Sequence, residues 1–513
     1  MLKEIIILFT TNSGFFIGLL REHIFVSFVS IIIATVLGVG IGIWISERPK
    51  LANIVLSVVN VLYTIPAIAL FGFLISLTGI GNTTAIVALT IYALLPMVRS
   101  TYTGIHTIDP LIVEAAEGMG STKSQILFKI KLPLALPVLM SGLRNMVTMT
   151  IALAGIASFV GAGGLGVSIY RGITTNNKAL TIAGSLLIAL MALFCDYVLG
   201  WMEKRVSKKK RADKLIVAVL LIILVTPLLM SGIFRWMPHS KTVKLATKPI
   251  TESYILGEII AQLIEEKTDI DVKVTHGIGG GTSNIHPAMI RGDFDMYPEY
   301  TGTIWQIVLK KNEPYDESKF PILQEEYERE HQLLWANLFG FNDTYSLAVR
   351  REVAEEYNLK TFTDLKRVAD KLIFGAEYDF YEREDGFSAL VSTYGLTFKQ
   401  QIDMDNGLKY QAMKDKKIDV MTIFTTDGQL STSDLVVLED DLHLYPSYLA
   451  GTVVRSEVLT THPELSDVLA QLNDVLDDTE MSRLNNEVET GGRTPEEVAK
   501  EFLGQKGLLE VGE

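Results

Sequence analysis

The sequence predicts two parts of different fold class, an all-α membrane part of about six spans followed by an α/β domain. Nearly half of the 513 residues are apolar, which is typical of a chain that combines membrane and soluble parts. Charge is divided in the same way: residues 1–240 hold 19 Lys and Arg against 9 Asp and Glu, whereas the remainder has a net charge of −23. This acidic second part offers no basic face to phosphates, so we expect no nucleic-acid partner.

Uncharged runs recur in the first part at the length that crosses a bilayer, about 20 residues. They predict spans at 24–45, 51–77, 78–98, from about 145, at 179–201 and at 215–234, with Pro66 interrupting the second. Polar residues break the apolar stretch 5–20, which we interpret as an interfacial helix and not as a signal peptide. Arg144 and Asp196 lie near the cytoplasmic ends of spans, and we expect both to form structural ion pairs.

Lysine and arginine mark the cytoplasmic side of a membrane protein. Seven of them lie within 204–214, and five more mark two further loops: Arg48, Lys50, Lys123, Lys129 and Lys131. The pattern predicts a multi-pass protein of the cell membrane whose domain after residue 240 is extracytoplasmic. The only cysteine, Cys195, lies in a predicted span, so we expect no disulfide in that domain.

The loop between the third and fourth predicted spans carries the most specific motif. It reads Glu114-Ala115-Ala116-Glu117-Gly118-Met119-Gly120, and after nine residues Ile130-Lys131-Leu132-Pro133. Small alanines permit close approach of a partner, Gly120 permits a tight turn, and Pro133 is expected to end one element before the next begins. This segment, 109–133, resembles the EAA loop of ABC importer permeases.

The resemblance implies that Glu114, Ala115, Ala116, Gly120 and Pro133 couple the membrane part to an ATPase. It implies as partners two copies of a separate ABC ATPase subunit, a second copy of this chain and the lipid bilayer. No G-x-x-x-x-G-K-[ST] loop occurs in the sequence, so ATP hydrolysis is expected from the separate subunit and the chain itself is not expected to be an enzyme. We expect no catalytic residue, no metal site and no cofactor.

After residue 240, short apolar strands alternate with amphipathic helices, as in α/β domains. The pattern predicts strands at 243–247, 272–275, 372–376, 420–424 and 435–438, and helices at 254–266, 386–394, 463–476 and 495–502. Four segments resemble binding proteins for glycine betaine, carnitine and choline: 247–253, 280–283, 297–303 and 425–428. This resemblance implies a two-lobed, periplasmic-binding-protein-like fold with a second lobe inserted at about 347–440.

The two resemblances together predict the domain organisation. Residues 1–214 form the permease domain with five spans, 215–240 the sixth span and a linker, and 241–513 the substrate-binding domain. The alternative function is that of a membrane-tethered receptor or sensor, which binds a ligand without moving it. A sensor has no need of an EAA loop, so we favour an importer.

A trimethylammonium group has no N–H to donate, so aromatic faces must hold it, at about 0.5–2 kcal/mol per cation–π contact. Tyr300 and Tyr345 are the candidates for such walls, although a half-buried core position is the usual fate of a tyrosine. Thr282 and Ser283 follow three glycines and precede a helical stretch. They are candidates to bind a ligand carboxylate, and the alternative is that they only cap the helix.

The remaining candidate ligand residues are Thr251 in the first matching segment, Arg350, Asp385 in the charged run 382–386, and Thr425 and Asp427 after a strand end. A surface charge is the alternative for Arg350. Phe424 stands where a four-tyrosine cage would have a hydroxyl, and the fourth wall is not placed. The layout of permease then binding domain is similar to that of ergothioneine importers, so the small zwitterionic or cationic solute stays open between ergothioneine and glycine betaine, carnitine or choline.

Overall fold

The computed structural model describes residues 2–175, 177–209, 241–311, 313, 315–383, 385–445 and 447–509. Two compact units make up the described chain, a helical unit that contains most of residues 2–209 and an α/β unit that contains residues 241–509. The predicted combination of fold classes is therefore confirmed. The predicted sixth span and linker, 215–240, lie outside the described residues.

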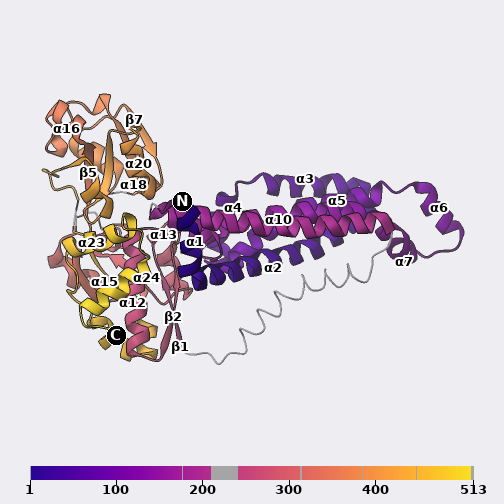
Figure 1. Ribbon diagram of the computed structural model, residues 1–513, viewed down its shortest axis with the longest axis horizontal. Coiled ribbons are helices and arrows are strands. Elements are labelled where there is room, and N and C mark those ends of the chain that lie inside the picture. The colour runs from indigo at the N-terminus through magenta and orange to yellow at the C-terminus, as the bar shows by residue number, and fades with distance from the viewer. Residues whose placement is uncertain are drawn as a thin grey trace. The chain divides into compact units, whose positions relative to one another are not determined.

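Long apolar helices form the first unit, and Figure 1 shows several of them running side by side. Four helical stretches among the described residues are long and apolar enough to cross a membrane: Ser13–Ser46, Asn82–His106, Lys123–Val160 and Lys178–Arg205. A further pair, α3 (Pro49–Thr64) and α4 (Ala67–Thr78), is bent by 98°. The bend falls at Pro66, because a proline removes a backbone donor and forces the preceding residue, Ile65, into an extended conformation.

Two expectations about the helix boundaries are wrong. The stretch 5–20 is not one helix: α1 (Leu2–Thr11) ends near Asn12, and α2 (Ser13–Ser46) already contains the residues after it. Pro133 does not separate two elements either, because it lies in the first turn of α8 (Leu132–Leu153), directly after a π-helical turn at Leu127–Lys131. The first turn of a helix tolerates proline, so the fourth span begins well before residue 145.

Small residues set the packing of the helical unit. Gly38 and Gly42 of α2 (Ser13–Ser46) face α5 (Asn82–His106), where a Cβ on Gly42 would lie 2.5 Å from Cβ of Thr101. Such a small-xxx-small spacing lets two membrane helices approach closely. Arg144 and Asp196, both expected to be paired, form a bidentate ion pair with each other at 2.5 and 2.7 Å across α8 and α10 (Lys178–Lys209).

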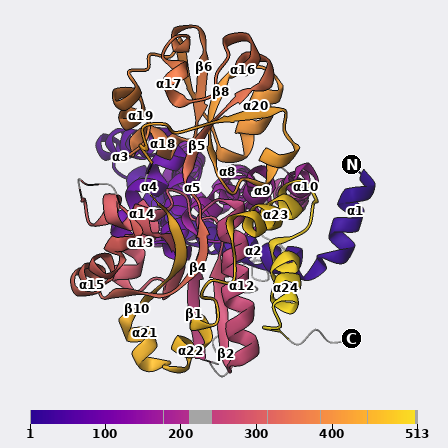
Figure 2. The ribbon, with the colours of Figure 1, turned by 90° about the vertical axis from the view of Figure 1, so that its left-hand side faces the viewer.

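The α/β unit consists of two lobes, each built on a five-stranded sheet (Figure 2). The first sheet has the order β2-β1-β3-β10-β4, with strands Ile270–Thr275, Lys241–Ala246, Met296–Tyr300, Leu449–Arg455 and Leu333–Asn342. The last strand of this sheet in the sequence, β10, is antiparallel to both β3 and β4. Five longer helices accompany this sheet: α12 (Thr251–Lys267), α13 (Thr282–Arg291), α15 (Phe320–His331), α23 (Asp478–Glu489) and α24 (Pro495–Gln505).

The second sheet has the order β7-β6-β8-β5-β9, with strands Gln400–Asp403, Ile373–Ala376, Val420–Phe424, Tyr345–Arg350 and Leu435–Leu438. Its helices include α16 (Arg351–Tyr357), α18 (Tyr378–Glu382), α19 (Phe387–Tyr394) and α20 (Lys409–Lys414). The predicted strands 420–424 and 435–438 have the observed bounds. The predicted helix 463–476 is too long, since α22 is Glu464–Ala470.

Gly42 provides a test of the helix packing. We expect Gly42→Leu to lower the apparent melting temperature of the detergent-solubilised chain, because the new side chain overlaps Thr101 and overpacking of this kind costs roughly 1–3 kcal/mol. Gly40→Leu is the matched control: it makes the same change two residues away on α2, where an added Cβ meets no atom within 4 Å. Equal melting temperatures for the two variants would contradict the close approach of α2 and α5.

Candidate ligand site and ATPase-coupling loop

Five aromatic rings gather where the two lobes are connected, and we call them the Tyr345 cluster. Tyr345 is the first residue of β5 and is 7% exposed. Its ring centroid lies 4.8–6.1 Å from those of the other four members: Phe424 at 4.8 Å, Phe380 at 5.3 Å, Tyr445 at 5.5 Å and Tyr448 at 6.1 Å. These rings come from β5, β8, α18 and the segment before β10, so the fold assembles an aromatic surface from four separate parts of the chain.

An ion pair lies against this surface. The guanidinium carbon of Arg383 is 5.5 Å from the ring centroid of Tyr345 and 5.9 Å from that of Tyr448. Arg383 donates from Nε and Nη2 to the two carboxylate oxygens of Asp385 at 2.7 and 2.5 Å, and the Tyr448 hydroxyl also donates to Asp385. Burial acts to raise the pKa of Asp385, but the Arg383 guanidinium outweighs it and holds that pKa below its ordinary value.

Tyr300 lies in a second polar group, in the first lobe. The Lys248 ammonium is 4.7 Å from the Tyr300 ring centroid and forms an ion pair with Glu299. Glu299, which is fully buried, also accepts hydrogen bonds from the Thr282 hydroxyl at 2.7 Å and the Tyr300 N–H at 2.8 Å. The predicted Thr282 and Tyr300 are thus brought together by an acid that the sequence analysis did not single out.

Two buried carboxyl groups meet at one hydroxyl between the lobes. Oγ1 of Thr426 lies 2.5 Å from Oε2 of Glu252 and 2.8 Å from Oδ1 of Asp343, and the Tyr300 hydroxyl donates to Oε1 of Glu252 at 2.5 Å. A hydroxyl carries one hydrogen, so Thr426 donates to one acid and accepts from the other, which must be protonated. Burial is the largest cause that raises the pKa of both acids, that of Glu252 to about 7.

Thr425 ties together the two segments that cross between the lobes. Its hydroxyl donates to the carbonyl of Asn342 at 3.2 Å and accepts from the N–H of Thr344 at 3.1 Å. The hydroxyl of Thr425 is therefore used at the crossing between the lobes.

Asp427 and Thr251 are both buried near this crossing. Asp427 accepts from the Tyr410 hydroxyl at 2.9 Å and from the Phe424 N–H at 3.1 Å, and burial raises its pKa. It thereby fixes the backbone that carries Phe424, one ring of the Tyr345 cluster. Thr251 begins α12, one residue before Glu252.

The structure does not bring Arg350 or Ser283 to the Tyr345 cluster. Arg350 ends β5 and forms ion pairs with Asp419 and Glu352. Arg350 lies five positions along the strand from Tyr345, roughly 16 Å away, so it is not part of the Tyr345 cluster. Ser283 is exposed in the first turn of α13. Arg383 supplies the guanidinium that the sequence analysis sought at Arg350.

The sequence analysis did not name several residues of the site, although most of them lie in or beside the segments that resemble known binding proteins. The segments that carried the family resemblance contain Lys248, Glu252 and Glu299. These charged side chains become largely buried only when the lobe folds, so the sequence alone does not mark them as inward-facing. Tyr445 and Tyr448 are the two rings of the Tyr345 cluster that the sequence analysis did not name, and either could be the fourth wall that it left unplaced. Their spacing on either side of a proline was the available signal, and the return of the chain as β10 brings them to Tyr345.

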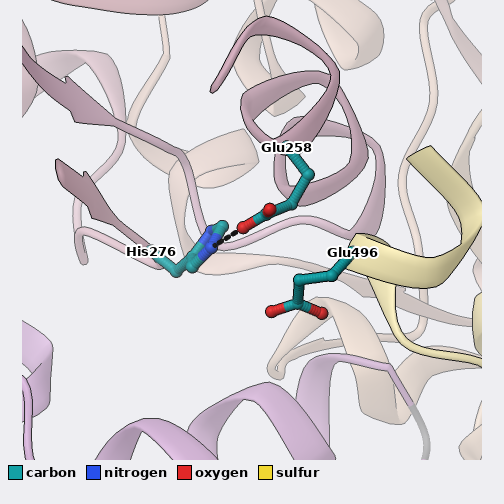
Figure 3. Close-up of side chains that lie close together, drawn as sticks. All are labelled: Glu258, His276 and Glu496. Carbon is teal, nitrogen blue, oxygen red and sulfur yellow. Dashed lines mark hydrogen bonds and ion pairs between the residues drawn. The ribbon is translucent and has the colours of Figure 1, made fainter. Parts of the chain in front are cut away.

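Figure 3 shows a separate group of Glu258, His276 and Glu496, whose ligand atoms lie within 4.8 Å of one another. Nε2 of His276 lies 2.7 Å from Oε1 of Glu258 and its Nδ1 lies 3.2 Å from the Thr247 hydroxyl. Both ring nitrogens thus have protein partners, so the imidazole is satisfied without a metal and we assign none.

The motif loop of the helical unit forms two short capped helices. Asp109 caps α6 (Pro110–Gly118), and Thr122 and Gln125 form a capping box on α7 (Lys123–Ile126). Gly120 joins them with φ +82°, a left-handed conformation that favours glycine.

The surface of this loop is exposed at most of the predicted coupling positions. Glu114, Ala115 and Gly120 are exposed, whereas Ala116 is buried. Four large apolar side chains of the loop are also exposed, the most exposed being Met119 at 80% and Leu111 at 68%. Apolar side chains exposed together in this way are typical of a surface that contacts another protein.

Comparisons with known proteins agree on both units. Residues 34–211 match the family described as binding-protein-dependent transport system inner membrane component, and residues 241–505 match the substrate binding domain of ABC-type glycine betaine transport systems. The chain is 42% identical to the ergothioneine transport permease/ergothioneine binding protein EgtU of Helicobacter pylori (strain G27) over 92% of this chain and 87% of that protein.

Each unit also has separate relatives. The chain is 38% identical to the carnitine transport permease protein OpuCD of Listeria monocytogenes, over 42% of this chain and 96% of the relative. It is 33% identical to the carnitine transport binding protein OpuCC of the same organism, over 52% and 88%. A crystal structure of a glycine betaine/carnitine/choline ABC transporter matches with a TM-score of 0.45, at 32% identity over 52% of this chain and 99% of that one.

The raised pKa of Glu252 makes the stability of the folded chain depend on pH, and we expect Glu252→Gln to remove this dependence. Between pH 4.5 and about 7 the folded chain keeps a proton on Glu252 that the unfolded chain releases, so raising the pH across this window destabilises the fold. The side-chain amide of glutamine does not titrate, and it offers one acceptor oxygen and one NH2 donor group at all pH values. We expect the melting temperature of this variant, relative to the unsubstituted chain, to rise from pH 5 to pH 8.

Glu266→Gln is the control for this measurement, because Glu266 is exposed on the same helix, α12. A difference for Glu252→Gln that stays constant between pH 5 and pH 8 would show that Glu252 does not hold the proton.

Proposed function

Because the chain belongs to the family of binding-protein-dependent importer subunits with a glycine-betaine-type binding domain, we propose that it takes up a betaine-type solute as the fused permease and substrate-binding subunit of an ABC importer. The Tyr345 cluster is the observation that carries the proposal. Its rings already lie against the guanidinium of Arg383, so they suit a cation that cannot donate hydrogen bonds.

The proposed ligand is a trimethylammonium solute, and ergothioneine is the first to test, followed by glycine betaine, carnitine and choline. The relative named for ergothioneine has the same order of permease and binding domain over most of the chain. The two cationic side chains near the rings, Lys248 and Arg383, lie beside different tyrosines. This arrangement suits a ligand that carries polar groups in addition to its cation.

We propose the following organisation in the membrane. Residues 1–214 form the permease domain, 215–240 the sixth span and linker, and 241–513 an extracytoplasmic binding domain with a second lobe at about 347–440. Two copies of the chain form one translocation path with two copies of a separate ATPase. The exposed apolar side chains of Leu111 and Met119 beside Gly120 support docking of that ATPase on loop 109–133.

Replacing Tyr345 tests the ligand site. We expect Tyr345→Ala to weaken binding of the preferred solute to the full-length chain by roughly 1 kcal/mol or more, about fivefold in Kd, and Tyr345→Phe to be milder because it keeps the ring. We expect Tyr300→Phe to weaken solute binding more than Tyr345→Phe does, because it removes the hydroxyl that donates to Glu252 and holds the Tyr300 ring in place. Calorimetric titration measures all three variants. Unchanged binding in Tyr345→Ala would refute the site.

Replacing Gly120 tests the coupling loop. Gly120→Asp adds a side chain at φ +82° and a charge on the exposed surface, so we expect uptake of radiolabelled solute by cells to fall at least about tenfold. The binding domain is untouched, so solute binding by the same variant is the internal control. Normal uptake would mean that this loop does not couple to the ATPase, and would reopen the tethered-receptor alternative.

A further inference from the structure

Arg383 occupies a position suited to a ligand cation. Its guanidinium lies over the rings of Tyr345 and Tyr448, at 5.5 and 5.9 Å from their centroids. The side chain is only 16% exposed, and Asp385 binds it through two hydrogen bonds. The cluster therefore holds a protein cation by the same interaction that a trimethylammonium group would use.

Two cations cannot share these ring faces without strong repulsion, because like charges a few ångströms apart in a buried site are poorly screened. Binding of a trimethylammonium group to Tyr345 therefore requires Arg383 to move away. The backbone permits this: Arg383 directly follows α18 with φ −72° and ψ 143°, an extended conformation outside the helix. No helical turn holds its side chain against the rings.

The guanidinium that leaves the rings stays close to the bound ligand, because the backbone of Arg383 remains in place. A planar guanidinium binds carboxylates through two parallel hydrogen bonds. A ligand with a carboxylate can therefore compensate for the contacts that Arg383 loses. Choline, which has a hydroxyl and no carboxylate, cannot.

We propose that Arg383 is a built-in substitute for the ligand cation and that its displacement selects solutes with a carboxylate over simple quaternary ammonium ions. This inference rests on the proposed function. It makes Arg383 a specificity-determining residue, since it disfavours every cation at the rings and then favours only ligands with an acidic end.

The test is titration of choline and glycine betaine onto the full-length chain in detergent, with and without Arg383→Gln. We expect choline to bind about fivefold more tightly to the variant, because the ring faces are released, and glycine betaine to bind more weakly. A gain in choline affinity cannot arise from misfolding. Arg383→Met, which keeps most of the apolar stem, carries the same expectation as a second variant. If both ligands shift in the same direction by the same factor, Arg383 does not select.

Asp385 provides the decisive control, because Arg383→Gln also frees a carboxylate that could itself attract choline. The double variant Arg383→Gln with Asp385→Asn has no such charge, and we expect choline still to bind more tightly than to the unsubstituted chain. If the double variant binds choline no more tightly than the unsubstituted chain, the tighter binding by Arg383→Gln comes from the freed Asp385 carboxylate, and the proposal is overturned. An unsubstituted chain that binds none of ergothioneine, glycine betaine, carnitine and choline would instead overturn the proposed function, and this inference with it.

Discussion

The single hydrogen on the Thr426 hydroxyl cannot satisfy two carboxylates, and the junction between the lobes depends on how this constraint is met. Glu252 comes from α12 of the first lobe, Asp343 from the segment that leaves it, and Thr426 from the segment after β8. One added proton lets all three groups bind at once. Because Glu252 also accepts from Tyr300, the same proton links the position of a candidate ligand-binding ring to the crossing between the lobes.

The rings of the site are accompanied by buried cations, each with an acid of its own. Lys248 pairs with Glu299, Arg383 with Asp385, and Lys409 with Glu377. Pairs of this kind add little net stability, because desolvation offsets most of their attraction. Their effect is geometric: each acid determines where its cation lies, and thus which ring faces are available to a ligand.

Sequence patterns predicted those helices and strands that neighbouring residues alone determine. The strands at 420–424 and 435–438 are apolar runs bounded by polar residues, and α12 is a long stretch without proline. The same reasoning did not find β3, which contains Pro298, or β10, which contains Gly451, because both residues are unusual in strands and are accepted here through pairing with distant partners.

Residues of the candidate site could be predicted when they lay within a segment that resembles known binding proteins. Residues that reach the site from distant parts of the sequence could not. Tyr300 and Thr282 are of the first kind. Arg350 was named as a candidate guanidinium, although a strand carries it away from the ring, whereas Arg383 lies in the charged run that contains the predicted Asp385. Tyr448 reaches the cluster only through the return of the chain to the first lobe, which no local pattern indicates.

The place of β10 also sets an order for biosynthesis. This strand lies between β3 and β4, so the first sheet stays split into two parts until residues 449–455 have left the ribosome. The second sheet, which ends with β9, is by then complete. The inserted lobe can therefore fold before the lobe that surrounds it. A chain truncated after β9 would expose unpaired edges of β3 and β4, which are templates for aggregation, so the last strand of the sheet protects both of these edges at once.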